Sequence, residues 1–566
     1  DHTHTAMGAR LLRRWLERPL TDVNRIIQRQ DGIEELTGHT TELSQLEEML
    51  EHVFDFERIL TRIEANTTSP KDLLALKASL GMIPEIKKLL SGTVSIVLRK
   101  LSDQMDIHST VYELLDRSMN ENGTGNIRDG KYIKEGYSAE LDEVRSLSEN
   151  SRKWIADLEE REKEKTGIKL KIGFNNVFGY YFEITNANKV PIPEYYMRKQ
   201  TLVNAERYIT PELKEFETKA LSAKEKTEEL ELKIYQAVKA AIRPEIAAMQ
   251  RTAKALAALD CLTGLSRAAL KDRYVRPQIT NSREGRISIH DGRHPMVEHA
   301  LKREMFVPND TELNHTDQEM IIITGPNMAG KSTYMRQVAV LTIMAQTGSF
   351  IPAKSASFAP VDRIFTRVGA ADDISTGQST FMVEMKEVSH ILCNATKNSL
   401  ILLDEIGRGT STYDGMSIAR AVVEYLNSKV HAYTLFATHY HELSDMAAEN
   451  EHIKNYTVTV KERGKEITFL RRIVPGSADK SYGIHVARLA GLPESLLKRA
   501  DEILEGLEVE GIKEEPAAPV IRRETALNLF SSPIIDELAD LDVMSKTPIE
   551  AMEILFRLSK EAKEGR

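Results

Sequence analysis

The sequence predicts a multidomain protein of the α and α/β classes, with a helical core and lever, a small inserted β domain, an α/β domain and a C-terminal helical element. Three observations lead to this fold class. The 566 residues suffice for roughly four domains of about 150 residues each. Apolar residues recur at helical spacing early in the chain, whereas after residue 276 short apolar runs alternate with helices. The composition, 41% hydrophobic and 28% charged, excludes a largely disordered or fibrous chain.

Residues 1–136 are predicted to form a helical core domain, in which Leu73, Leu76 and Leu80 illustrate the spacing of the apolar side chains. Residues 137–168 are predicted to form one long lever helix, because apolar residues such as Leu141 and Val144 recur among many charged ones. The helical pattern resumes over residues 211–270, where we expect a returning lever helix.

Between the two lever segments the hydrophobic period changes to two. Residues 169–185 have the sequence KLKIGFNNVFGYYFEIT, which predicts two strands joined by a turn at Asn175 and Asn176. Residues 201–210 predict a further strand. We therefore expect a small β domain over residues 169–210, at the tip of two helical arms.

Residues 271–505 are predicted to form an α/β domain with a partly parallel sheet. A flexible linker is expected over 506–532, where Glu, Pro and Ala are abundant without a helical period. Residues 533–566 are expected to form a helical tail. Its amphipathic helix would present the apolar side chains Ile549, Met552, Ile554, Leu555 and Leu558.

Charge and cysteine content narrow the class of protein. The net charge of −9 argues against a chain wrapped in nucleic acid over its whole surface, but it leaves room for a local basic patch. Cys261 and Cys393 are too few for a disulfide framework or a zinc site, and we expect both to be core residues in a reducing cytosol. No apolar run approaches the ~20 residues of a bilayer span, so no membrane partner is expected.

The strongest chemical signal is MIIITGPNMAGKST over residues 320–333, in which an apolar strand leads into a GxxxxGKS loop and a helix. Such a loop brings backbone N–H groups close to phosphate oxygens, and the helix dipole adds to the attraction. Lys331 is expected to neutralise phosphate charge, and Ser332 to coordinate Mg²⁺. A chance glycine-rich turn is the alternative. The expected nucleotide-binding residues are Gly325, Pro326, Asn327, Met328, Ala329, Gly330, Lys331, Ser332 and Thr333.

Two further predicted strands end in polar residues. The run LILL over 400–403 is followed by Asp404 and Glu405, 73 residues after Lys331. Asp404 suits a Mg²⁺ ligand and Glu405 can polarise an attacking water, so the pair predicts a hydrolase, unless both acids only cap the next helix. The strand over 433–437 leads to His439, which we expect near the γ-phosphate. The alternative is that His439 is a buried core histidine. A zinc site is not supported by the spacing of the residues around it.

Four segments together resemble the MutS family of DNA mismatch-repair ATPases. They are GPNMAGKS over 325–332, DDISTGQSTFMVEM over 372–385, DEIGRGTST over 404–412 and FATH over 436–439. The start of the chain resembles the core domain of that family, residues 180–183 and 198–213 resemble its DNA clamp, and residues 480–499 resemble its dimer-forming helical element. The resemblance covers nearly the whole chain.

This resemblance implies an ABC-like ATPase that binds ATP or ADP with Mg²⁺ and acts as a homodimer. Phe306 would stack on adenine, unless it is a buried strand aromatic. Ser379 would reach the nucleotide of the partner subunit, and capping of its own helix is the alternative. The expected catalytic residues are Lys331, Asn327 near the γ-phosphate, Asp404, Glu405, His439 and, from the partner subunit, Ser379.

The resemblance also implies partners and a location. The β domain would clamp double-stranded DNA, with phosphate contacts from Arg198, Lys199, Asn204 and Arg207, for which a solvated edge strand is the alternative. A MutL-type repair protein is an expected partner, and the tail would promote tetramers. The sequence ALNLF over 526–530 resembles the peptide that docks on the replicative sliding clamp, although a generic apolar patch is the alternative. The expected location is the cytoplasm, in association with the nucleoid.

One departure from the family pattern limits the expected function. The family detects mismatches with a Phe-x-Glu sequence in an N-terminal domain, and none of the 15 phenylalanines here is followed two positions later by Glu. The chain also begins at Asp1 rather than Met, so we expect a fragment that lacks the mismatch-recognition and connector domains. It should hydrolyse ATP and clamp DNA without discriminating mismatches.

Three alternatives to this function remain open. The first is an SMC-like or other ABC-type DNA-structural ATPase, although a chromosome-structural ATPase would place a long coiled coil where only 73 residues separate Lys331 from Asp404. A transporter ATPase subunit would lack the helical and clamp regions. A DNA-binding scaffold with a degenerate ATP site differs from an ATPase only in turnover.

Overall fold

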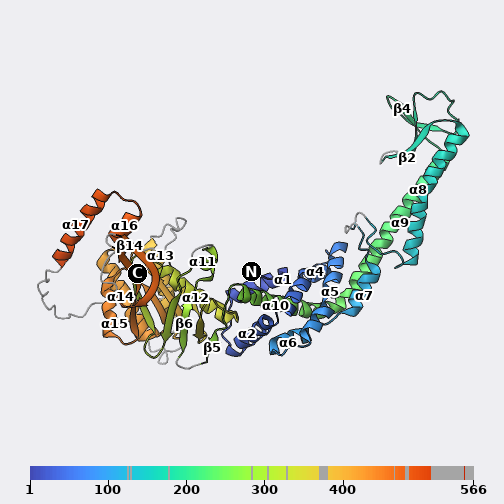
Figure 1. The fold of residues 1–566 in the computed structure, drawn as a ribbon. Helices are drawn as coiled ribbons and strands as arrows, with labels where there is room; N and C mark the ends of the chain where they lie inside the picture. Colours follow the sequence, from blue (N-terminus) through green and yellow to red (C-terminus); the bar gives the residue numbers. More distant parts are fainter. Residues whose placement is uncertain are drawn as a thin grey trace. The chain divides into compact units, whose positions relative to one another are not determined.

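The chain divides into two compact units, Asp1–Val486 and Ala487–Arg566 (Figure 1). The first unit contains a helical core, a pair of long helices that carry a small sheet, and an α/β module. The computed structural model describes residues 1–123, 127, 130–175, 179–281, 285–301, 305–326, 329–368, 380–463, 466–477, 483–511, 554 and 557.

The first 118 residues are helical, as predicted from their apolar spacing. Four of the helices begin at a Thr, Asp or Ser whose side chain accepts a backbone N–H of the first turn, namely Thr5, Asp22, Asp55 and Ser69. The helices are α1 (Ala6–Glu17), α2 (Val23–Gly38), α3 (Thr40–Glu51), α4 (Phe56–Glu64), α5 (Pro70–Leu90), α6 (Ile96–Gln104) and α7 (Ser109–Ser118).

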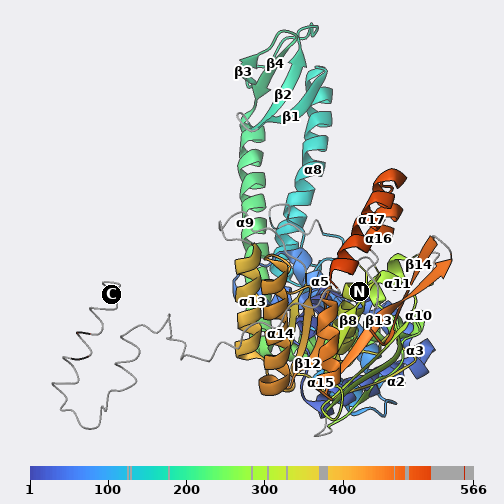
Figure 2. The ribbon, with the colours of Figure 1, turned by 90° about the vertical axis from the view of Figure 1, so that its left-hand side faces the viewer.

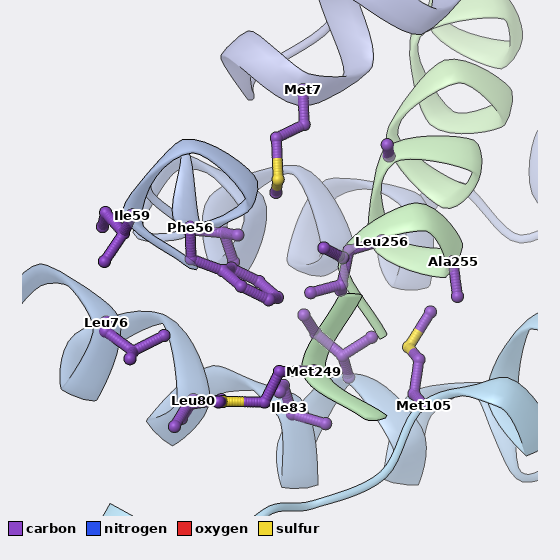
Figure 3. Packing of buried hydrophobic residues seen from close by; sticks show 14 of the residues in the cluster. Met7, Phe56, Ile59, Leu76, Leu80, Ile83, Met105, Met249, Ala255 and Leu256 are labelled. Carbon is purple, nitrogen blue, oxygen red and sulfur yellow. The ribbon is translucent and has the colours of Figure 1, made fainter. Parts of the chain in front are cut away.

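A later helix, α10 (Ile246–Lys271), supplies a large part of the apolar core of this helical domain. Figure 3 shows Met249 and Leu256 of α10 directed toward Phe56 and Leu80, and all four side chains are at most 1% exposed. The prediction of a single returning lever helix over 211–270 is therefore wrong. Its first part is α9 (Pro211–Ile242), and a 3-10 turn at Arg243–Glu245 separates α9 from α10, because Pro244 has no N–H to continue the helical hydrogen bonds.

The two arms are α8 (Ala139–Thr166) and α9, which lie side by side with a small sheet at their far end (Figure 2). The rings of Trp154 and Phe216 stack between the arms with their centroids 3.9 Å apart. A hydrophobic cluster that includes Leu158 of α8, Phe182 of the sheet and Leu213 of α9 joins the sheet to both helices.

The small sheet is antiparallel, in the order β1-β2-β4-β3. The expected hairpin is confirmed by the pairing of the first two strands, although residues 176–178 of its turn lie outside the described part of the chain. The strand expected over 201–210 is shorter, and another strand precedes it. The strands are β1 (Leu170–Asn175), β2 (Gly179–Thr185), β3 (Met197–Thr201) and β4 (Ala205–Ile209).

The α/β module is built on a six-stranded sheet in the order β10-β11-β12-β8-β13-β14. The pairings are parallel except for that between the last two strands, so the predicted partly parallel sheet is confirmed. The strands are β8 (Met320–Thr324), β10 (Ile364–Arg367), β11 (Leu400–Asp404), β12 (Tyr433–Ala437), β13 (Ile453–Arg463) and β14 (Glu466–Pro475).

A second sheet, in the order β5-β9-β6-β7, belongs to the same module. Its strands are β5 (Gln278–Ile279), β6 (Arg286–Gly292), β7 (Asn309–Asn314) and β9 (Ser355–Phe358). The helices of the module are α11 (Pro295–Ala300), α12 (Lys331–Thr347), α13 (Thr380–Asn394), α14 (Thr412–Tyr425) and α15 (Met446–Glu449).

Both faces of the six-stranded sheet are buried. On β8, Ile321 and Ile323 pack in the cluster that contains α12 and the second sheet, whereas Ile322 packs in the cluster that contains α13 and α14. Alternate residues of a strand point to opposite faces, so an uninterrupted apolar strand is what a doubly covered sheet requires.

The C-terminal end of α12 is bonded to the helical core. The last carbonyl groups of a helix have no partner within it. Here the N–H of Leu20 donates to the carbonyl of Gln346 at 3.0 Å, and the guanidinium of Arg29 donates to the carbonyl of Thr347 at 2.8 Å. The Arg29 guanidinium also lies 3.5 Å from the centre of the Trp15 ring. The helix that follows the glycine-rich loop is therefore attached to α1 and α2.

Two expectations need correction in the later part of the chain. The flexible linker does not begin at 506, because α17 (Glu494–Gly511) continues through residues that contain no proline before Pro516. Cys393 is exposed on α13, whereas Cys261 is buried as expected. The expected linker beyond residue 511, the ALNLF segment and the tail helix fall outside the described residues, apart from residues 554 and 557. The preceding helix is α16 (Gly483–Leu489).

Among the described residues, the structure contains no helix with the length and hydrophobicity that a bilayer span requires.

Packing around α10 gives the first prediction. Replacing Leu256 by Ala is expected to lower the free energy of unfolding by about 2–5 kcal/mol, because a cavity forms where the side chain was fully buried. Leu270→Ala on the same helix, where the side chain is 37% exposed, should cost less than about 1 kcal/mol. Urea unfolding followed by circular dichroism measures both variants, and equal losses would contradict the central place of α10 in the core.

Candidate active site

Three neighbouring parallel strands bring the predicted site residues to one edge of the six-stranded sheet. Asp404 at the end of β11 pairs with Ala437 at the end of β12, and Ala437 pairs with Ile323 of β8. The carboxyl ends of parallel strands are where α/β sheets bind ligands. Residues that are far apart in the sequence therefore meet because of the strand order β11-β12-β8.

The glycine-rich loop joins β8 to α12. Gly325 and Gly330 have φ angles of +129° and +105°, which an L-amino acid with a side chain rarely adopts. Gly330 precedes the first residue of α12, and Ala329 is buried. Asn327 and Met328 lie outside the described residues, so their predicted roles stay predictions.

Lys331, the first residue of α12, is 4% exposed. Its ammonium group donates to the carbonyl groups of Gly325 and Pro326, which places it under the loop. Burial lowers the pKa of Lys331, while the nearby carboxylates of Glu405 and Asp404 favour its charged form.

Ser332 and Asp404 form a hydroxyl–carboxylate pair. The Ser332 Oγ donates to Oδ2 of Asp404 at 2.5 Å. The other carboxylate oxygen, Asp404 Oδ1, is buried and has no hydrogen-bond partner among the described residues. Burial raises the pKa of Asp404. A buried carboxylate oxygen without a partner, next to a serine hydroxyl, fits the hard oxygen ligands that Mg²⁺ prefers.

Glu405 follows β11 directly and adopts a left-handed backbone conformation, with φ +56°. Its N–H donates to the carbonyl of Ala437 at 2.9 Å, and its carboxylate bonds to Nε2 of His439 at 2.5 Å and to Arg408. The hydrogen bond to His439 is the largest influence on the pKa of Glu405, which falls to about 2. Glu405 is therefore a carboxylate at neutral pH.

Two alternatives to the predicted roles are not observed. Asp404 and Glu405 do not cap the next helix, because the side chain of Ser411 accepts the first-turn N–H of α14. His439 is not a buried core histidine either, since it lies exposed in the loop after β12. Among the described residues, no cluster of three or more His, Cys, Asp or Glu could hold a metal ion.

Phe306 lies half-buried beside the glycine-rich loop, outside any strand, since β7 begins at Asn309. It borders a cavity of about 170 Å³ together with Gly330 and Thr333. The interpretation of Phe306 as a buried strand aromatic is thus wrong, and an aromatic ring does border the space next to the loop. A planar group of adenine's chemistry could stack there.

A second cavity, of about 420 Å³, opens beside Asp404 and Glu405. Its lining includes three arginines that the sequence analysis did not single out, Arg336, Arg367 and Arg408. Arg336 lies four residues after Ser332 on α12, so helical spacing could have identified it. Arg408 lies in the turn after β11 and forms an ion pair with Glu405, three residues earlier in the sequence. Arg367, at the end of β10, has no such signal.

The four residues predicted to contact DNA belong to β3, β4 and the turn between them. Lys199 and Asn204 are exposed. Arg198 pairs with Glu206 at 3.1 Å, and Arg207 pairs with Glu183 at 3.1 Å and stacks over the Tyr181 ring. Both arginines are thus partly engaged within the sheet. Ser379, predicted to act on the partner subunit's nucleotide, lies outside the described residues, just before α13.

Two protein-family models match the chain, MutS domain III over residues 1–266 and MutS domain V over residues 321–508. The chain is similar to proteins named DNA mismatch repair protein MutS. That of Caldicellulosiruptor bescii is 49% identical over 573 residues, covering 99% of this chain and 66% of the relative. That of Clostridium perfringens is 45% identical, covering 100% of this chain and 68% of the relative. The chain thus spans about two thirds of the length of these curated relatives.

The pH dependence of stability tests the pairing of Glu405 with His439. Because the pKa of Glu405 is lowered from 4.5 to about 2, its carboxylate stabilises the fold above pH 4.5, and this contribution is lost as the pH falls from there through 2. The thermal unfolding midpoint of the unaltered chain should exceed that of Glu405→Gln at pH 7, by a margin that shrinks below pH 4.5. A constant margin from pH 7 to pH 3 would contradict the pairing.

Proposed function

The chain belongs to the MutS family of DNA mismatch-repair proteins, and on that premise we propose that it hydrolyses ATP at the β8–β11–β12 edge and holds duplex DNA with its β domain. One observation above all supports the ATPase proposal. The glycine-rich loop, the Ser332–Asp404 pair and the Glu405–His439 pair meet at one edge of the sheet. The SMC-like alternative is not favoured, because the family models and relatives are those of MutS.

In the proposed mechanism, each residue has a separate task. Lys331 and the loop N–H groups bind the phosphates, and Phe306 stacks on the adenine. Ser332 and Asp404 would hold Mg²⁺, which would supply charge neutralisation at the phosphate oxygens. Glu405, ionised at neutral pH, accepts a hydrogen bond from the attacking water and orients it in line with the γ-phosphate.

His439 has two roles in this proposed mechanism. Its bond to Glu405 fixes the direction of the carboxylate. From its position after β12, His439 would also approach the γ-phosphate of a bound ATP. Asn327 would contribute to phosphate binding from the loop. Ser379 would complete the site of a partner subunit in a homodimer, so that two bound ATP molecules become part of the interface. This arrangement rests on the family resemblance and on the position of Ser379 before α13.

The remaining partners are proposed on family membership. The β domain would track the phosphates of double-stranded DNA, with Lys199 and Asn204 as its exposed polar residues. No phenylalanine of this chain belongs to a Phe-x-Glu sequence, so DNA held by these residues would be bound without preference for mismatches. A MutL-type protein, the sliding clamp and assembly through the tail remain expectations from the resemblance.

Separate loss of binding and of turnover would test the ATPase proposal. Lys331→Ala should weaken ATP binding by about tenfold or more, because a buried cation facing the phosphates is lost. Glu405→Ala should keep ATP binding and lower kcat by about 10²–10⁴-fold, because it removes the group that orients the water. Nucleotide retention and phosphate release measure the two effects. Lys354→Ala, at an exposed lysine of the same module, is the control and should change neither. Full turnover by Glu405→Ala would remove Glu405 from the catalytic role.

Salt-dependent binding would test the DNA proposal. Lys199→Ala should weaken binding to matched and mismatched duplexes alike and reduce the salt slope of log K by about 1, as expected for one lost phosphate contact. Lys100→Ala, an exposed lysine on α6, should leave both quantities unchanged. Fluorescence anisotropy at several salt concentrations gives the slopes. A clear preference of the unaltered chain for mismatched DNA would refute the proposed lack of discrimination.

A further inference from the structure

Glu384 of α13 is a buried carboxylate that bonds to the loop carrying Glu405. Glu384 is 5% exposed, and its Oε1 accepts a hydrogen bond from the N–H of Gly407 at 2.7 Å. Gly407 lies two residues after Glu405, in the segment between β11 and α14. A buried charge is costly unless it is paired or hydrogen-bonded, so this contact needs compensation from its surroundings.

Arg367 supplies that compensation. Its guanidinium lies at the end of β10, 3.5 Å from Oε2 of Glu384 and 2.9 Å from Glu387 one turn further along α13. Arg367 and Glu384 are each 7% exposed at their side chains, so water screens their attraction only weakly. Glu384 therefore joins two parts of the module, with β10 on one side and the Glu405 loop on the other.

The loop itself has little freedom to relax. The Tyr440 hydroxyl donates to the carbonyl of Gly407 at 3.1 Å. This carbonyl belongs to the peptide group that follows Gly407, whereas Glu384 accepts the N–H of the peptide group that precedes it. Gly407 has φ +88°, and a side chain added there would meet the carbonyl oxygen of Gly415 at 2.5 Å. Glu405 adopts a left-handed conformation, which persists in a residue with a side chain only when the surroundings impose it.

We propose that Glu384 is a positioning residue for Glu405, acting by holding the N–H of Gly407. The inference rests on the proposed function, in which Glu405 orients the attacking water. When Glu384 is lost, the bond from Tyr440 to the carbonyl of Gly407 remains but the N–H of Gly407 is no longer held, so Glu405 can leave the direction set by its contacts with His439 and Ala437. A misplacement of about 1 Å at a catalytic group can lower a rate about 10²-fold.

The chain offers conservative and control variants for a test. Glu384→Ala removes the acceptor, whereas Glu384→Gln keeps an oxygen in the same place. Glu387→Ala removes the other carboxylate on the same helix that contacts Arg367, whereas the N–H of Gly407 is bonded to Glu384. Steady-state ATP turnover, equilibrium ATP binding and hydrogen–deuterium exchange of residues 404–412 are measured on all three variants.

The expected result separates kcat from binding. Glu384→Ala should lower kcat by about 10–100-fold, with the Kd for ATP changed by less than about threefold. Its exchange at 404–412 should rise, Glu384→Gln should recover most of the turnover, and Glu387→Ala should stay within about twofold of the unaltered chain. Unchanged turnover and exchange in Glu384→Ala would overturn the inference, as would an equal loss in Glu387→Ala or a parallel loss of ATP binding.

If Glu384→Ala fails to fold, the double variant Glu384→Gln with Tyr440→Phe tests the inference instead. It weakens the bond to the N–H of Gly407 and removes the bond to its carbonyl, without creating a large cavity. Its kcat should fall further than the product of the two single effects, and simple multiplication of the single effects would overturn the inference. Absence of turnover in the unaltered chain would refute the proposed function instead. The exchange data at 404–412 would then still test whether Glu384 holds the loop.

Discussion

The hydrogen bonds at the C-terminal end of α12 connect this helix, and the glycine-rich loop that precedes it, to the helical core. This helix begins at Lys331 under the glycine-rich loop and ends at Thr347, where Leu20 and Arg29 satisfy its last carbonyl groups. Gly348 follows with φ +90°, and a side chain there would meet the Arg29 side chain at 2.5 Å. The 17 residues of α12 span about 25 Å as one stiff rod. A displacement of the glycine-rich loop would therefore be transmitted along α12 to α1 and α2.

At the edge of the six-stranded sheet where β8, β11 and β12 end, firmly packed strands lead directly into a residue with an unfavourable backbone conformation. The strands β8, β11 and β12 are buried on both faces, so their ends are held firmly, and only the residues just beyond those ends are free to serve chemistry. Glu405 is the first such residue after β11, and its left-handed backbone is stabilised by a bond to Ala437 of the neighbouring strand. Rigid strands thus support a backbone conformation that an isolated loop would abandon.

Local patterns predicted the helices and strands around the candidate site well where the interactions are local. The strand, loop and helix over 320–333 and the strand before Asp404 are contiguous in sequence, so their spacing was sufficient. The role of α10 was missed because a core helix and a lever helix share the same apolar period, and only packing distinguishes them. Arg367 was missed because its place depends on the pairing of β10 with β11. Cys393 has the same helical context as a buried residue, but its position on α13 faces outward.

Among the described residues, the hydrophobic cluster at the tip of the arms shares no member with the clusters of the core or of the α/β module. Leu158, Phe182 and Leu213 pack in this cluster and not in the cores of the helical domain or of the α/β module. Such a cluster behaves as a separate cooperative unit, with its own free energy of opening. The small sheet can therefore open and close locally while the packing that orders the edge of the six-stranded sheet stays intact.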